Sequence, residues 1–138
     1  MLHVGSGSLG LLLAPFGLAA RKARGRHTRI GWVYAGLVTV LAVSAVGLAA
    51  LHRAQLWWLA AIAVATELAV LGGLAARRRG SDVWHVSLMC GSYVSLVTAL
   101  LVVNLGGPVA WILPTAAGSP VIAWTARRAA LRDARAAP

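Results

Sequence analysis

The sequence has 138 residues, of which 59% are hydrophobic and 12% are charged, and its formal net charge is +10. Soluble domains average about 45–50% apolar and about 25% charged residues, and a chain of this length could not bury so much apolar surface in water. The composition therefore excludes a soluble globular enzyme, a disordered chain and a disulfide-framed secreted domain, and it predicts a membrane protein.

Five apolar segments predict transmembrane helices, because a helix needs about 20 mainly apolar residues to cross a bilayer. In chain order they cover residues 4–20, 30–51, 56–76, 83–105 and 109–126. Pro114 and Pro120 lie in the last segment and should kink it or leave it partly re-entrant. The sequence thus predicts an all-α, polytopic transmembrane helix bundle, with one domain over residues 1–126 and a basic cytoplasmic tail over residues 127–138.

Clusters of Lys and Arg follow the first, third and fifth segments, at residues 21–29, 77–79 and 127–135. With five spans these clusters share one side of the membrane, and the positive side of a membrane protein is cytoplasmic. We therefore expect a multi-pass protein of a bacterial inner membrane, with its N-terminus outside and its C-terminus in the cytoplasm. The tryptophans all lie within a few residues of a predicted span end, where Trp is enriched.

The distribution of the basic residues also indicates the partners. Long apolar runs separate the clusters, so anionic lipid headgroups are a simpler partner for them than nucleic acid. Small residues recur at every fourth position over residues 61–73 and again over residues 87–99. Such stripes permit close approach of helices in lipid, and they predict helix–helix contacts within the chain or in a homo- or hetero-oligomer.

Several local patterns have a simple interpretation. Residues 5–10 match G-x-G-x-x-G, but no strand can precede them and no βαβ unit surrounds them, so we reject a dinucleotide site. Cys90 is the single cysteine, which excludes an internal disulfide, and we expect it to pack as a small residue. Ser81 or Asp82 can cap the fourth helix, which we favour over an ion pair between Asp82 and the arginines at 77–79.

Glu67 lies near the middle of the third predicted span, where a charge is costly and an ionisable residue is a candidate functional site by default. No Lys or Arg occurs at matching depth, so we expect Glu67 to be protonated or hydrogen-bonded to groups such as Ser44, Thr66, Ser95 or Thr98. Two alternatives stay open: a neutral glutamic acid with a structural hydrogen bond, or the centre of a proton-coupled transport unit, which would need an oligomer.

The histidines lie at the predicted span ends, with His27 and His85 on the cytoplasmic side and His3 and His52 on the outer side. Neutral imidazole is the commonest metal ligand, and membrane cytochromes hold haem b between histidines. The four histidines are therefore candidate ligands of haem b, and His27 with His85 is a candidate metal-binding pair. Ordinary interfacial histidines are the alternative.

Two stretches resemble a known family. Residues 24–34 read RGRHTRIGWVY, and residues 84–93 read WHVSLMCGSY. Together with His3 before a Gly-rich first span, they resemble a bacterial predicted-membrane-protein family, the domain of unknown function family twenty-three-oh-six, over residues 3–128. The resemblance implies a small polytopic membrane protein with no settled biochemical activity. The positions that match it are His3, His27, Arg29, Gly31, His85, Met89, Ser92, Tyr93 and Asn104.

The match to this family departs from its pattern at two points. Thr28 separates His27 from Arg29, whereas the family has the basic residue directly after the histidine. His52 and Glu67 fall outside the pattern.

The sequence assigns no catalytic residue and favours a binding, scaffolding or assembly role in the membrane. A haem b or metal-binding redox protein and a proton-coupled unit centred on Glu67 are the alternatives.

Overall fold

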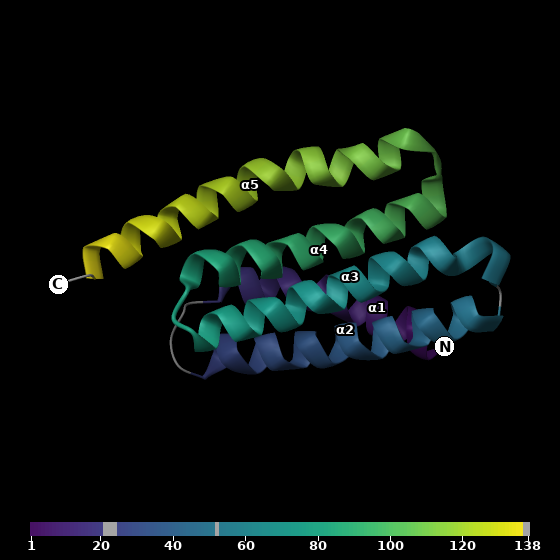
Figure 1. Ribbon diagram of the computed structural model, residues 1–138, viewed down its shortest axis with the longest axis horizontal. Coiled ribbons are helices and arrows are strands. Elements are labelled where there is room, and N and C mark those ends of the chain that lie inside the picture. The colour runs from purple at the N-terminus through teal and green to yellow at the C-terminus, as the bar shows by residue number, and fades with distance from the viewer. Residues whose placement is uncertain (21–24, 52, 137–138) are drawn as a thin grey trace. The chain divides into compact units, whose positions relative to one another are not determined.

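The computed structural model describes residues 1–20, 25–51 and 53–136, and every regular element within these ranges is an α-helix. The helices are α1 (Leu2–Ala19), α2 (Arg26–Leu51), α3 (Arg53–Arg78), α4 (Asp82–Leu105) and α5 (Gly107–Ala136) (Figure 1). All five are long and apolar enough to cross a membrane. The prediction of an all-α bundle with five candidate spans is therefore confirmed.

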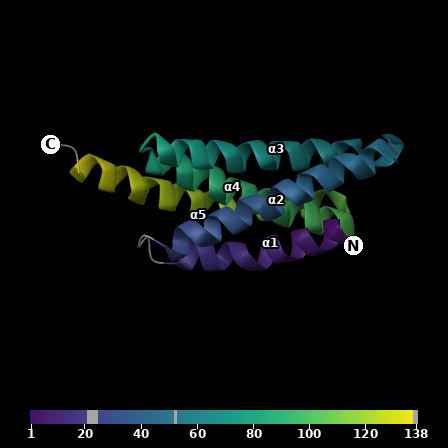
Figure 2. The same cartoon turned by 90° about the horizontal axis from the view of Figure 1, so that it is seen from below.

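The chain forms two compact units, Met1–Glu67 and Leu68–Pro138, which divide inside α3. In the first unit α1 lies along α2 (Figure 2). The buried residues of α1 are small and recur at every fourth position, at Ser6, Gly10 and Ala14. This spacing places them on one face of the helix, so the two backbones approach closely.

In the second unit α4 lies along α5, and the C-terminal turns of α5 continue beyond the start of α4 (Figure 1). Gly118 permits this contact, because a Cβ atom there would overlap the side chain of Val94. Cys90 is buried in α4, as expected for a small packing residue. Only part of the small-residue stripe of α3 lies in a helix–helix contact. Gly73 is buried and packs against Met89, whereas Ala61 and Ala65 are exposed.

Of the two alternatives for the fifth segment, a kinked helix or a partly re-entrant segment, its continuity does not support the second. Helix α5 is continuous from Gly107 to Ala136 with Pro114 and Pro120 inside it, and at 30 residues it is about 45 Å long. Transmembrane helices tolerate internal proline when neighbouring groups satisfy the freed carbonyls. The helix also passes through the expected start of the tail at residue 127. Gly106 and Gly107, with φ of 65° and 72°, make the turn that separates α5 from α4.

Candidate functional site

Glu67 makes its hydrogen bond with a residue that the sequence did not single out. Its Oε1 lies 2.8 Å from Oγ1 of Thr39, so the contact joins α3 to α2 within the first unit. The expected partners Ser44 and Thr66 donate to carbonyl oxygens of their own helices. Ser95 and Thr98 belong to the second unit, so their expected contact with Glu67 stays a prediction. Hydrogen bonding of Glu67 was thus correctly predicted, but the partner is Thr39.

The second carboxyl oxygen of Glu67 has a different environment. Oε2 is buried and has no hydrogen-bond partner among the described residues. Glu67 and Thr39 both lie near the middle of their helices, which is the deepest position for a helix that crosses a bilayer. A polar atom buried there without a partner is costly, and more so when the group carries a charge.

The Thr39 hydroxyl can serve both protonation states of Glu67. Its Oγ1 lies 3.0 Å from the carbonyl oxygen of Ala35 and 2.8 Å from Oε1 of Glu67. A hydroxyl has one hydrogen to donate and two lone pairs to accept with. It donates to Glu67 when the carboxylate is charged. When Glu67 is protonated, the Thr39 hydrogen bonds to Ala35 instead, and Oγ1 accepts the proton of the acid. Rotation of this one hydroxyl therefore lets Thr39 stay hydrogen-bonded to Glu67 in either protonation state.

Two histidines hold neighbouring helices together through the same contact. Nδ1 of His27 on α2 lies 3.0 Å from the carbonyl oxygen of Gly17 on α1, and Nδ1 of His85 on α4 lies 2.8 Å from that of Gly73 on α3. A carbonyl oxygen only accepts, so Nδ1 carries the hydrogen in both rings. In the neutral ring Nε2 is then the basic nitrogen, which is the form that ligates metals.

The remaining histidines lie elsewhere. Nδ1 of His3 on α1 lies 3.0 Å from Oγ of Ser44 on α2, so this ring also joins two helices. His52 lies outside the described residues. In the described part of the chain, no group of three or more His, Cys, Asp or Glu side chains could hold a metal ion. His27 belongs to the first unit and His85 to the second, so the proposed pair stays a prediction.

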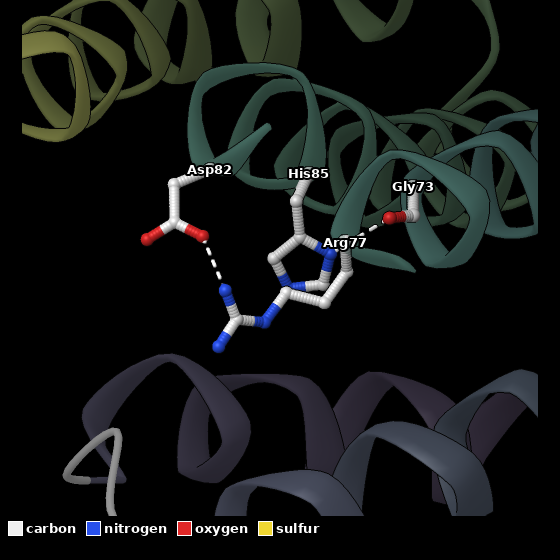
Figure 3. A network of polar contacts seen from close by, with 4 residues as sticks. All are labelled: Gly73, Arg77, Asp82 and His85. Carbon is white, nitrogen blue, oxygen red and sulfur yellow. Dashed lines mark hydrogen bonds and ion pairs between the residues drawn. The ribbon is translucent and has the colours of Figure 1, made fainter. Parts of the chain in front are cut away.

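The turn between α3 and α4 is held by an ion pair rather than by a helix cap. Nη1 of Arg77 lies 2.6 Å from Oδ1 of Asp82, next to the His85–Gly73 contact (Figure 3). Ser81 is the N-cap residue of α4, but no side chain of the described residues makes a capping hydrogen bond there. The expected cap by Ser81 was therefore wrong, and the alternative ion pair of Asp82 is confirmed. Asp82 still lies in the first helical turn, where a negative charge is favourable.

A repeated pentapeptide precedes both carbonyl-bonded histidines and is a sequence signal for these contacts. Residues 17–21 and residues 73–77 both read Gly-Leu-Ala-Ala-Arg. In each copy the carbonyl of the glycine accepts the hydrogen bond from the histidine of the next helix. Each glycine is also a point of close approach, since a Cβ atom would lie 3.1 Å from Ile30 at Gly17 and 3.0 Å from Met89 at Gly73.

Comparisons of the chain with protein-family models, with curated proteins and with solved structures find no match. The resemblance to the domain of unknown function family twenty-three-oh-six stays a prediction, based on the residues around His27 and His85. The function is therefore argued from the contacts of the chain itself, and above all from the environment of Glu67.

Proposed function

We propose that this chain is a multi-pass inner-membrane protein that transports protons, in which Glu67 takes up a proton from one side of the bilayer and releases it to the other. One observation carries the proposal: the carboxyl group has one oxygen buried without a partner among the described residues and the other 2.8 Å from Thr39. In the proposed orientation the N-terminus is outside and the C-terminus is in the cytoplasm, as the basic clusters favour.

The two protonation states differ in cost at this position. A charged carboxylate would leave Oε2 desolvated and without a donor among the described groups, which is expensive away from water. Protonation removes the charge, and the acid hydrogen then bonds to Thr39, whose own hydrogen bonds to Ala35. Every hydrogen of the pair has an acceptor in that state.

A purely structural Glu67–Thr39 contact, in a protein with a scaffolding or assembly role, is the competing proposal. The full chain reconstituted in liposomes with an internal pH-sensitive dye distinguishes the two. An imposed potassium diffusion potential should drive proton uptake in the unmodified protein, and Glu67→Gln should abolish it while leaving the fold intact. Thr98→Val is the matched control, because the Thr98 hydroxyl bonds to Val94 of its own helix. Equal uptake by the unmodified protein and Glu67→Gln would favour the structural role.

We propose binding of haem b or of a metal ion as the second candidate function, with His27 and His85 as candidate ligands. Its support is the Nδ1 hydrogen bond of each ring to a backbone carbonyl, since metal-ligating histidines are usually oriented by such a bond. The full chain expressed with ample haem should then show a Soret band that His27→Ala and His85→Ala remove and His3→Ala retains. A colourless preparation without stoichiometric metal would reject this candidate.

A further inference from the structure

A groove lies beside the turn between α3 and α4, in the second unit. Its apolar floor is formed by Gly72, Ala75 and Ala76 on α3 and by Leu88 on α4. The groove is half open and has a volume of about 330 Å³. The small residues of α3 create the hollow, because none of their side chains reaches far from the helix. A short apolar chain segment therefore fits against this floor.

The polar and charged residues of the lining lie at the turn between the two helices, and we call this end of the groove its mouth. Arg79 and Ser81 belong to the turn, and Trp84 lies in the first turn of α4. Arg77 is paired with Asp82 at 2.6 Å, and this contact neutralises the acidic group closest in sequence to the mouth. Arg79 is exposed at the end of the run of three arginines. The charge at the mouth is therefore complementary to an anion.

Two further groups at the mouth suit a phosphate at a membrane surface. The hydroxyl of Ser81 makes no capping hydrogen bond within the described residues, so it can donate to a ligand, and it lies at the N-terminus of α4, where anions are favoured. Trp84 is 64% exposed, and an exposed indole next to apolar surface is typical of the membrane–water interface. A free phosphate would use the polar mouth alone and leave the apolar floor without a function.

We propose that this groove binds one anionic phospholipid, with its headgroup phosphate at Arg79 and Ser81 and part of an acyl chain against Ala76 and Leu88. The site goes beyond general attraction of basic loops to anionic membranes, because it requires a guanidinium group, a hydroxyl and an apolar floor together. It is independent of the proposed proton exchange at Glu67.

The test is lipid binding by the full chain, purified in a mild detergent and measured by native mass spectrometry. Phosphatidylglycerol and phosphatidylcholine with identical acyl chains are added separately, and inorganic phosphate is added as a competitor. We expect one phosphatidylglycerol molecule to be retained per chain, more tightly than phosphatidylcholine. Inorganic phosphate should not displace it, because phosphate makes no contact with the apolar floor.

Three variants distinguish lipid binding in the groove from general electrostatic attraction to anionic lipid. Circular dichroism checks that each variant is folded. Arg79→Gln should weaken phosphatidylglycerol binding by about fivefold. Arg132→Gln removes the same charge from an exposed position on α5 and should change binding by less than about twofold. Ala76→Phe fills the groove and should weaken binding of both lipids. Equal losses for the two arginine variants, equal retention of the two lipids, or displacement by phosphate would each overturn the proposal.

Discussion

Oγ1 of Thr39 and Oε1 of Glu67 lie 2.8 Å apart and join the middle of α2 to the middle of α3. In a bilayer a hydrogen bond between helices contributes about 0.6 kcal/mol on average and up to about 2 kcal/mol. The contact therefore makes a modest contribution to holding α2 against α3.

Thr39→Val should lower the free energy of unfolding by about 1 kcal/mol, because it removes the hydroxyl and keeps the shape of the side chain. Reversible unfolding in mixed micelles measures the change. A double-mutant cycle with Glu67→Gln should give a coupling energy of about 0.5–1 kcal/mol. The same cycle with Thr98→Val in place of Thr39→Val should give no coupling. Equal coupling in both cycles would mean that Thr39 does not bind Glu67.

The helices themselves follow from hydropathy, since a run of about 20 apolar residues has few alternatives in a chain this small. Their partners across helices depend on the rotation of each helix about its axis, which hydropathy does not specify. Thr39 shows this: it lies at the same relative depth as Glu67, and matching depth alone would have made it a candidate. Asp82 shows a second limit of sequence-based prediction. Its carboxylate could bind either the helix N-terminus or the nearby Arg77, and the sequence does not decide between these two partners.

Gly118→Ala should destabilise the second unit by about 1–3 kcal/mol, because the added methyl group overlaps Val94 of α4. Gly91→Ala is the control, because no described atom would lie within 4 Å of the added Cβ. Since Ala has a higher helix propensity than Gly, this variant should have an unchanged free energy of unfolding or one raised by up to about 1 kcal/mol. Thermal unfolding followed by circular dichroism compares the two. Val94→Ala should partly rescue Gly118→Ala, and an absence of rescue would place the clash elsewhere.

Asp82→Asn should cost less than about 1 kcal/mol of stability, because the ion pair is partly exposed, with 60% of the Arg77 side chain and 21% of that of Asp82 accessible. High salt screens such a pair, so the difference from the unmodified protein should shrink as ionic strength rises. Asp133→Asn, on the exposed end of α5, is the matched control for loss of one negative charge. A large cost that is insensitive to salt would assign Asp82 a role beyond this ion pair.

Single cysteines in a Cys90→Ala background test the orientation. A membrane-impermeant thiol reagent added to intact cells should label Pro108→Cys, at the start of α5. It should leave Thr28→Cys and Asp133→Cys unlabelled until the membrane is opened, because both lie next to basic clusters. Labelling of Thr28→Cys and Asp133→Cys from opposite sides would contradict five spans.

The protonation of Glu67 is tested most directly by infrared spectroscopy of the full chain in lipid, recorded as the pH is raised. The chain has only three acidic side chains, Glu67, Asp82 and Asp133, so the carbonyl stretch of a protonated carboxyl group can be assigned by substitution. We expect a band that disappears reversibly at high pH, that is lost in Glu67→Gln and that persists in Asp82→Asn and Asp133→Asn. A band that persists in Glu67→Gln, or one from Glu67 that no pH removes, would contradict proton exchange at this residue.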